Sequence, residues 1–321
     1  MPLTSHRRLT FAPRADTARR GETARQFGVV RRLVTAGFGA LVLLTAACST
    51  SGPAPSTSEL GADGPPRAIV SLSPTATEML YAIGAGEQVV AVDDQSDYPA
   101  DAPVTDLSGY TPNVEAVLGY DPDLVVANAD TADLVAGLER AGVETLILPA
   151  ARTLDDTYSQ LEQLGAATGH VGDAAELVSR MGSEIDEIVA AMPDRDAPLR
   201  YYHELDNTFY TVTDDTYLGA IYAMLGLRSI ATGGNGYPQL SAEYVLEQNP
   251  DVIFLADGQC CGVTPESVAQ RAGWGELTAV REGQVHLLDE DIASRWGPRV
   301  VDLVREIATI VADAPAVRPT P

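Results

Sequence analysis

A pattern of eleven residues occurs twice in the chain with the same internal spacing. The first copy is Glu115-x-Val-Leu-x-x-x-Pro-Asp-Leu-Val, and the second, 128 residues later, is Glu243-x-Val-Leu-x-x-x-Pro-Asp-Val-Ile. Each copy predicts a helix, a Pro-Asp turn and a buried strand. Asn113 and Ser241, two residues before each glutamate, are good helix N-caps. The glutamates fall in the first helical turn, where the helix dipole favours a negative charge by about 0.3–1 kcal/mol. The repeat therefore predicts two related lobes.

Strands and helices alternate between these copies and on either side of them. In the first half, short apolar strands are predicted at 68–72, 89–92, 124–127 and 145–148. Ser73-Pro74 predicts the start of a helix after the first strand, and Thr75 with Glu78 suggests a capping box there. Strands that alternate with helices predict a mostly parallel α/β sheet in each lobe.

A long amphipathic helix is predicted between the two halves. Its apolar positions recur at steps of four, four, three and four residues, as Leu177, Met181, Ile185, Ile188 and Met192. About 20 helical residues span about 30 Å. We therefore expect an α/β fold of two Rossmann-like lobes joined by one long α-helix. The expected bounds are 67–170 for the N-terminal lobe, 171–193 for the connecting helix and 194–315 for the C-terminal lobe, with a final helix near 300–311.

The first residues have the features of an export signal. Arg31 and Arg32 precede an apolar run that ends at Cys48, and this run of about 15 residues is shorter than the roughly 20 that span a membrane. The segment before Cys48 resembles a bacterial lipobox, which implies a lipoprotein signal peptide at 1–47 and a lipid on Cys48. An ordinary signal peptide with a free cysteine is the alternative. Residues 48–66, rich in Ser, Gly, Pro and Ala, are expected to form a flexible tether.

The charge of the chain excludes one class of partner. Its formal net charge is −24, and a surface this acidic repels nucleic acid and anionic lipid headgroups. Membrane attachment is therefore expected through the lipid alone, at the outer face of the cytoplasmic membrane.

Several motifs together resemble one known family. These are Arg-x-Ile-Val-Ser-Leu-Ser-Pro-x-x-Thr-Glu at 67–78, Ser-Asp-Tyr-Pro at 96–99, the two Glu-x-Val-Leu segments, and Arg-x-Gly-Pro-Arg at 295–299. They are similar to those of the cobalamin and ferric-siderophore substrate-binding proteins of ABC transporters. The resemblance implies a periplasmic-binding-protein-like fold of class III, with a single-helix hinge. It also implies a monomer that is not an enzyme, has no cofactor, and delivers a solute to a dimeric ABC permease. Glu115 and Glu243 match the glutamates that salt-bridge to permease arginines in that family.

Candidate ligand contacts follow from the position of the predicted strands, because solutes of open α/β sheets bind beyond the carboxyl ends of strands. The residues expected there are Ser73, Gln95, Tyr98, Asn128, His203, Glu204, Asp206, Tyr210, Arg295 and Trp296. The resemblance adds Tyr110 and Tyr237, which lie at or near positions where cobalamin binders carry tryptophans that flank the ring. Asn128 departs from another such aromatic position. The cargo expected is a corrinoid, similar to vitamin B12, or an iron chelate.

The charged residues of the predicted cleft narrow this choice. Arg152, Arg295 and Arg299 are the cations expected near it, and the acidic residues around them favour a neutral or cationic solute. Haem is an alternative cargo, with Tyr210 or His203 as axial ligands.

A metal site in the tract 203–206 is disfavoured. Along a strand His203 points away from the side shared by Tyr202, Glu204 and Asp206, so these groups do not converge on one ion. No metal ion is therefore expected.

Two further possibilities stay open at this stage. Cys260 and Cys261 are adjacent and could form a vicinal disulfide or remain as two thiols near the cleft mouth. A sensory lipoprotein that binds a solute without transport would share all these features. An exported hydrolase is disfavoured, because no Gly-x-Ser-x-Gly motif is present.

Overall fold

The computed structural model of the protein describes residues 64–315. Cys48, the signal peptide and most of the predicted tether lie outside this range, so the expectations about them stay predictions. Within it, no helix combines the length and the apolar character needed to cross a membrane.

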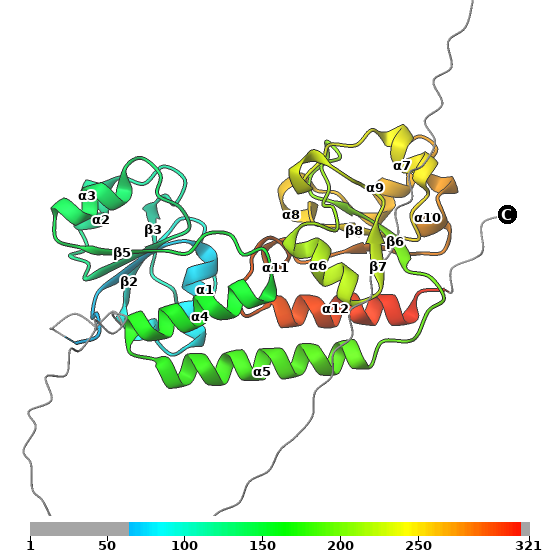
Figure 1. Cartoon of the computed structure of the whole chain (residues 1–321). Coiled ribbons are helices and arrows are strands. Elements are labelled where there is room, and N and C mark those ends of the chain that lie inside the picture. The colour runs from blue at the N-terminus through cyan, green and yellow to red at the C-terminus, as the bar shows by residue number, and fades with distance from the viewer. Residues whose placement is uncertain (1–63, 316–321) are drawn as a thin grey trace, which may run out of the picture. The chain divides into compact units, whose positions relative to one another are not determined.

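The N-terminal lobe is a parallel five-stranded sheet covered by helices (Figure 1). The strand order is β3-β2-β1-β4-β5, and neighbouring strands are parallel throughout. The strands are β1 (Ile69–Leu72), β2 (Val89–Asp93), β3 (Val104–Leu107), β4 (Leu124–Ala127) and β5 (Glu144–Ile147). The helices are α1 (Pro74–Ala82), α2 (Val114–Leu118), α3 (Leu134–Arg140) and α4 (Leu154–Thr168), with a 3₁₀ turn η1 (Gly86–Gln88).

The C-terminal lobe repeats the plan with a four-stranded parallel sheet. Its strand order is β7-β6-β8-β9. The strands are β6 (Leu199–Glu204), β7 (Leu227–Ser229), β8 (Val252–Leu255) and β9 (Val285–Leu287). The helices are α6 (Tyr217–Met224), α7 (Ala242–Gln248), α8 (Gly258–Cys261), α9 (Pro265–Ala269), α10 (Thr278–Arg281), α11 (Glu290–Ser294) and α12 (Val300–Asp313), with 3₁₀ turns η2 (Gly234–Gly236) and η3 (Trp274–Glu276).

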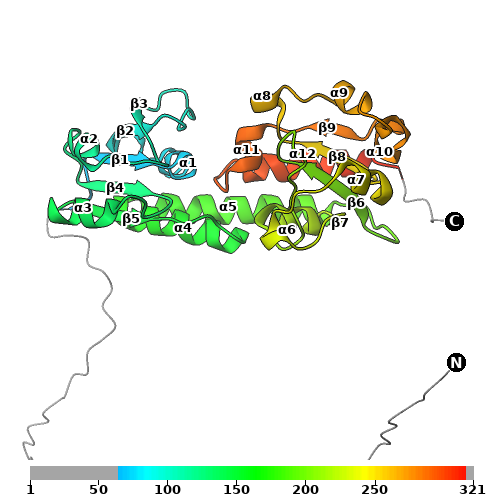
Figure 2. The same cartoon turned by 90° about the horizontal axis from the view of Figure 1, so that it is seen from above.

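Helix α5 (Val171–Ala190) connects the lobes and runs alongside both of them (Figures 1 and 2). It packs against α4 of the first lobe and against α12 of the second. Its buried residues Leu177, Met181 and Ile185 belong to one apolar cluster that also contains Leu80 of the N-terminal lobe and Phe254 of the C-terminal lobe. The hinge helix is therefore part of a core that both lobes share.

The duplicated pattern forms the same local structure in both lobes. The Asn113 side chain accepts a hydrogen bond from the backbone N–H of Ala116 at 3.0 Å, and Ser241 accepts one from Tyr244 at 3.2 Å, so both predicted N-caps are confirmed. The aspartate of each Pro-Asp turn accepts from the backbone at the start of a neighbouring strand. Asp123 receives the N–H of Arg67 at 2.7 Å, and Asp251 receives that of Arg200 at 2.8 Å. In each lobe the repeat thus caps a helix, and its aspartate binds the backbone at the start of a neighbouring strand.

The predicted fold class of two α/β lobes is confirmed, but two local expectations were wrong. Strand β3 was not predicted, because its sequence Val-Thr-Asp-Leu carries polar residues and it lies at the edge of its sheet. The capping box at Thr75 and Glu78 does not form. Ser73 alone caps α1, accepting from the N–H of Ala76 at 3.3 Å, and the Glu78 carboxylate binds two arginines instead.

Candidate functional site: the cleft between the lobes

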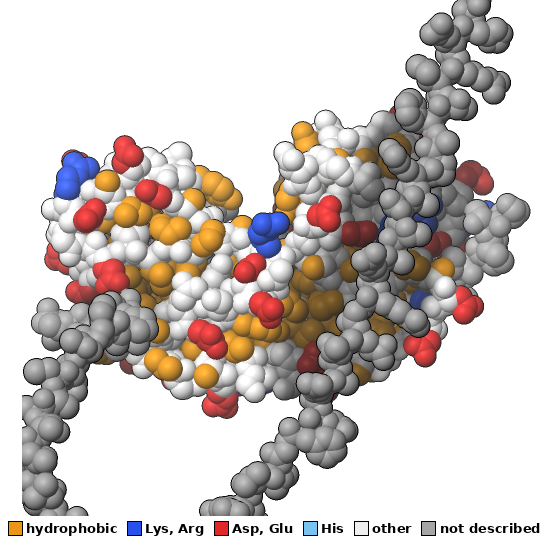
Figure 3. Space-filling model, in the orientation of Figure 1, with side chains coloured by type: hydrophobic (Ala, Val, Ile, Leu, Met, Phe, Trp, Pro, Cys, Tyr) orange, Lys and Arg blue, Asp and Glu red, His pale blue; other side chains and the backbone are white. Residues whose placement is uncertain are grey.

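A cavity of about 390 Å³ lies between the two lobes. Figure 3 shows the surface hollowed there. The N-terminal lobe lines it with Ser73, Pro74, Thr75, Gln95, Tyr110 and Asn128, and the C-terminal lobe with Leu205, Ala256, Glu290, Asp291, Ala293, Ser294, Arg295 and Trp296. Six of the twelve ligand contacts predicted from sequence line this cavity, namely Ser73, Gln95, Tyr110, Asn128, Arg295 and Trp296.

The lining residues all follow the carboxyl ends of strands. Ser73 comes directly after β1 and Asn128 directly after β4, while Leu205 follows β6 and Ala256 follows β8. Parallel strands end at one edge of each sheet, and the two edges face the same space. This is where open α/β sheets place their ligands.

Two arginines of the segment between α11 and α12 converge on Glu78, which is almost fully buried on α1. Arg295 donates from Nη1 to Glu78 Oε1 at 2.9 Å, and Arg299 donates from Nε to Glu78 Oε2 at 3.0 Å. Arg299 also lies over the ring of Tyr98, with its guanidinium carbon 4.1 Å from the ring centre. These contacts join the segment that follows β9 to the N-terminal lobe.

The sequence prediction treated these arginines as cations available to a ligand, and the structure gives them other partners. Arg295 also binds Asp97 at 3.1 Å and Asp291 at 2.9 Å. Arg152 is exposed but does not line the cavity. In the described part of the chain the cavity thus has no lining arginine that is free of a carboxylate, which disfavours a strongly anionic solute.

The acidic residues of the cavity are held in different ways. Glu290 Oε2 accepts the backbone N–H groups of Gln259 and Cys260, both at 3.0 Å. Burial raises the pKa of Asp291 above its usual value, and the neighbouring Arg295 opposes that rise. The cavity wall therefore carries a weak negative charge.

Exposed tyrosines surround the cleft. Tyr110 lines the cavity and is 79% exposed, so its ring is available to stack on a solute. Tyr98, Tyr210 and Tyr237 are exposed on loops that follow β2, β6 and β7, but they do not line the cavity. Trp296 is held in place by its indole N–H, which donates to Gln160 Oε1 of α4 at 2.9 Å.

Leu205 lines the cavity, but its neighbours His203, Glu204 and Asp206 do not. His203 is fully buried, its Nδ1 lies 2.8 Å from the Tyr222 hydroxyl, and burial lowers its pKa to about 4. Glu204 is fully buried and pairs with Arg271. Asp206 lies beyond the end of β6, where it accepts from the N–H of Thr208 at 2.8 Å in a tight turn. The prediction that His203 and Glu204 point to opposite sides is confirmed, but Asp206 is not on the strand.

These positions do not favour contact between His203, Glu204 or Asp206 and a cleft ligand. In residues 64–315 no group of three or more His, Cys, Asp or Glu side chains could hold a metal ion.

Sequence reasoning missed a buried acidic group next to this tract. Asp257 lies two residues beyond the end of β8 and is fully buried, and neither carboxylate oxygen has a hydrogen-bond partner. Burial and the nearby Glu204 raise the pKa of Asp257 to about 7. An aspartate at the end of an apolar strand was the available signal, but the sequence does not show that the following turn covers it.

Cys260 and Cys261 are joined by a disulfide in α8, and both residues are exposed. Helix α8 is the turn whose N–H groups hold Glu290. The disulfide therefore lies in the helix whose backbone binds Glu290, a residue of the cavity wall.

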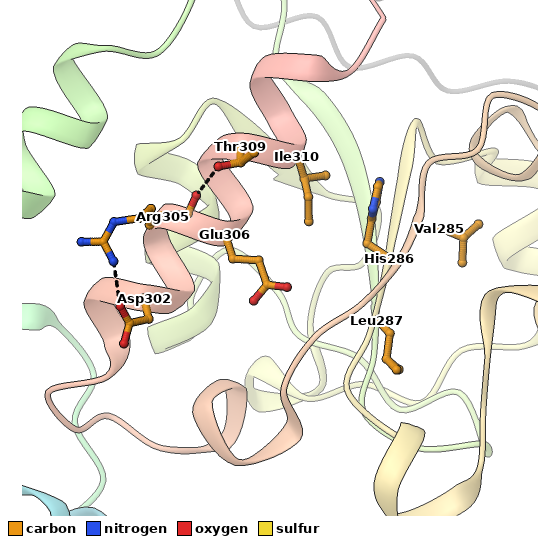
Figure 4. A pocket seen from close by; sticks show the side chains of 8 residues that line it. All are labelled: Val285, His286, Leu287, Asp302, Arg305, Glu306, Thr309 and Ile310. Atoms are coloured by element: carbon orange, nitrogen blue, oxygen red, sulfur yellow. Dashed lines mark hydrogen bonds and ion pairs between the residues drawn. The ribbon is translucent and has the colours of Figure 1, made fainter.

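A second cavity, of about 640 Å³, lies between β9 and α12 (Figure 4). Its lining comes from the edge strand and the outer side of the helix, including His286, Glu306 and the ion pair of Asp302 with Arg305 at 2.7 Å. Although larger, it does not lie beyond the carboxyl ends of the strands. The cleft between the lobes is therefore the better candidate for solute binding.

Residues 69–292 match the family described as periplasmic binding protein. The chain belongs to this family. Its members are solute-binding proteins that work outside the cytoplasm, and this periplasmic binding protein has the expected architecture of two α/β lobes.

Individual members of the family are similar to this chain over most of its length. It is 32% identical over 252 residues to an uncharacterized ABC transporter substrate-binding lipoprotein of Bacillus subtilis, covering 76% of this chain and 79% of that one. It is 32% identical over 281 residues to a cobalamin-binding protein of Halobacterium salinarum, covering 82% and 74%. The crystal structure of the periplasmic vitamin B12 binding protein BtuF of Vibrio cholerae is similar with a TM-score of 0.61 and 28% identity, covering 77% and 97%.

The periplasmic binding protein carries its two repeat glutamates on equivalent helices. Glu115 lies in the first turn of α2 and Glu243 in the first turn of α7, and both side chains are exposed. Hydrogen bonds from its own backbone and from Ser241 lower the pKa of Glu243, which keeps it ionised.

Proposed function

We propose that this protein binds a corrinoid in the cleft between its lobes and delivers it to an ABC importer. It acts in this proposal as a carrier and not as an enzyme. The observation that supports a corrinoid best is the cavity itself, which combines the exposed ring of Tyr110 with a wall that has no free arginine among the described residues. The cobalamin-binding relatives named above agree with that chemistry.

The proposed contacts are the polar and aromatic residues that line the cavity. Ser73, Gln95 and Asn128 supply hydrogen-bonding groups from the N-terminal lobe, and Tyr110 supplies a ring face. Trp296 closes the opposite wall. Tyr98, Tyr210 and Tyr237 are exposed at the surrounding loops and are proposed to contact the parts of a large solute that extend beyond the cavity.

Haem is a weaker candidate on the same geometry. An axial ligand must reach the iron. His203 is fully buried and hydrogen-bonded to Tyr222, and Tyr210 does not line the cavity. An anionic iron chelate is weaker too, because Arg295 and Arg299 are engaged by carboxylates.

The identity of the solute is tested by measuring the thermal unfolding of the protein in the presence of cyanocobalamin, cobinamide, haem or ferric siderophores. A ligand at 100 times its dissociation constant stabilises the folded state by about 2.7 kcal/mol. A rise in melting temperature with either corrinoid is the expected result. A rise with haem or a siderophore alone would replace the corrinoid proposal.

Glu115 and Glu243 are proposed to dock onto arginines of the two permease subunits. The Glu115→Ala/Glu243→Ala double variant should keep its solute affinity and lose uptake in cells. The matched control Glu162→Ala/Glu266→Ala removes the same charge from exposed positions on α4 and α9 and should transport normally. Normal uptake by the first variant would refute the docking role.

Cys48 is proposed to carry the lipid that holds the protein at the outer face of the cytoplasmic membrane. Metabolic labelling with a radioactive fatty acid should mark the wild-type chain and not a Cys48→Ala variant. Equal labelling of both chains would place the lipid elsewhere.

A further inference from the structure

The disulfide between Cys260 and Cys261 lies in the same short turn that holds one wall of the cleft. Helix α8 contains Gly258–Cys261, and the N–H groups of Gln259 and Cys260 both donate to Glu290 Oε2 at 3.0 Å. Glu290 lines the cavity. The carboxylate is thus drawn toward α8 by two hydrogen bonds that a charged acceptor strengthens.

The turn itself is fixed by few other contacts. The N–H of Cys261 donates to the Asp257 carbonyl at 3.2 Å and the N–H of Gly262 to the Gly258 carbonyl at 3.1 Å. Asp257, at the helix N-cap position, makes no side-chain capping bond. The disulfide closes a small ring around the Cys260–Cys261 peptide, so it restrains the residue whose N–H binds Glu290.

Both cysteines are also accessible. Each is exposed, and residues 64–315 contain no further cysteine with which either could pair. A thiol reagent can therefore reach the sulfur atoms without unfolding the lobe.

We propose that Cys260–Cys261 is a redox modification site that controls whether Glu290 is held at α8 or released into the cleft. The reductant is a dithiol, either a small molecule or a protein thiol–disulfide oxidoreductase. Its thiolate attacks one cysteine sulfur, the S–S bond breaks, and the departing sulfur takes a proton. Its second thiol then displaces the first cysteine, so two electrons and two protons pass to the protein and the reductant becomes a disulfide.

The reduced turn loses the ring that restrains the Cys260 N–H. The Glu290 carboxylate, which lines the cavity beside Asp291 on the same helix, is then no longer held against α8 and turns further into the cleft. The reduced protein has a more negative cleft than the oxidised protein, and this change occurs whichever solute the cleft accepts.

The first test measures modification and local structure in the full chain, purified in detergent without ligand. Iodoacetamide should add two groups to the peptide containing Cys260 and Cys261 after native treatment with dithiothreitol, and none before it. Amide hydrogen exchange in residues 258–262 should become at least tenfold faster on reduction. Resistance of the native protein to dithiothreitol, or unchanged exchange after reduction, would overturn the proposal.

Two variants distinguish the proposed release of Glu290 on reduction from a general increase in the mobility of residues 258–262. The Cys260→Ser/Cys261→Ser variant should have the amide exchange rates of the reduced protein. Dithiothreitol should not change these rates. Glu290→Gln should exchange faster even when oxidised, because a neutral acceptor binds the two N–H groups more weakly. If Glu290→Gln exchanges at the wild-type rate in both redox states, Glu290 is not the group that is released.

Tryptophan fluorescence gives a readout inside the cleft. The chain has two tryptophans, and Trp274 is buried while Trp296, like Glu290, lines the cavity. Reduction should change the emission of the wild type and leave that of the Cys260→Ser/Cys261→Ser variant constant. A wild-type emission that does not respond to reduction would show that the cleft does not sense the disulfide.

Discussion

Glu78 on α1 accepts a hydrogen bond from Arg295 Nη1 at 2.9 Å, although 217 residues separate them in the sequence. Arg299 binds the same carboxylate. Nearly all of the Glu78 side chain is buried, so the two guanidinium groups supply the interactions that water would otherwise provide. The contact crosses from the N-terminal lobe to the segment that follows the last strand of the C-terminal lobe.

Glu78→Gln should lower the free energy of unfolding by about 3 kcal/mol, because it leaves two largely buried guanidinium groups with less negative charge between them. Urea unfolding followed by circular dichroism measures this. The control is Glu184→Gln, which loses a half-exposed pair with Arg305 and should cost about 0–1 kcal/mol. Equal losses in the two variants would contradict the structural role of Glu78.

Tyr110→Ala should weaken cyanocobalamin binding about fivefold, because the ring lines the cavity and its loss removes roughly 1 kcal/mol of stacking and apolar contact. Tyr120→Ala is the matched control, since Tyr120 is an exposed tyrosine of the same lobe that does not line the cavity. Isothermal titration calorimetry compares them. Similar affinities for Tyr110→Ala and Tyr120→Ala would remove Tyr110 from the site.

Asp257→Asn should stabilise the protein at alkaline pH. The folded state raises the pKa of Asp257 to about 7 from an ordinary value of 3.8, so the folded state holds this proton more tightly than the unfolded state does. The stability contributed by the proton is complete below pH 3.8 and is lost as the pH rises through 7. At pH 8 the variant should be more stable than the wild type by about 2 kcal/mol or more.

The comparison needs unfolding curves of both proteins at pH 5 and pH 8. At pH 5 Asp257 is mostly protonated in the folded state and resembles asparagine, so the difference between the proteins should be much smaller there. A difference that is the same at both pH values would show that Asp257 does not titrate between them.

His203 should make the wild type less stable in acid. Burial lowers its pKa to about 4, whereas in the unfolded chain it takes a proton near pH 6.5. The unfolded state therefore binds more protons between these values, and stability falls by up to about 1.4 kcal/mol for each pH unit between 6.5 and 4. His203→Gln should lack this slope. Parallel pH profiles of the two proteins would contradict the assignment.

The sequence allowed the lobes and the hinge to be predicted because these depend on local signals. The steps between Leu177, Met181 and Ile185 mark one helix face, and that face is buried in α5. Asn113 and Ser241 cap their helices as their residue types and positions suggest. Local hydrogen bonds and periodic burial are properties of neighbouring residues, so a single sequence reveals them.

Contacts between distant segments could not be predicted in the same way. Glu78 has the spacing of a capping-box residue, and only the packed structure brings Arg295 and Arg299 to it. His203 and Glu204 were expected near a ligand because they end a strand, but both are buried, against Tyr222 of α6 and against Arg271. Half of the predicted ligand contacts line the cavity because the carboxyl ends of parallel strands are recognisable, whereas the covering loops are not.

The shared apolar cluster has a consequence for how the protein unfolds. Leu80 of the first lobe, Ile185 of α5 and Ile307 of the final helix belong to one continuous apolar cluster. Each lobe also has a smaller cluster of its own on the other face of its sheet, but the largest cluster is shared. Separate melting of the lobes would expose the inner faces of α5 and α12 to water while half of the chain stayed ordered. We therefore expect the two lobes to unfold as a single cooperative unit. Calorimetry should show one heat-absorption peak whose van't Hoff enthalpy equals the calorimetric enthalpy.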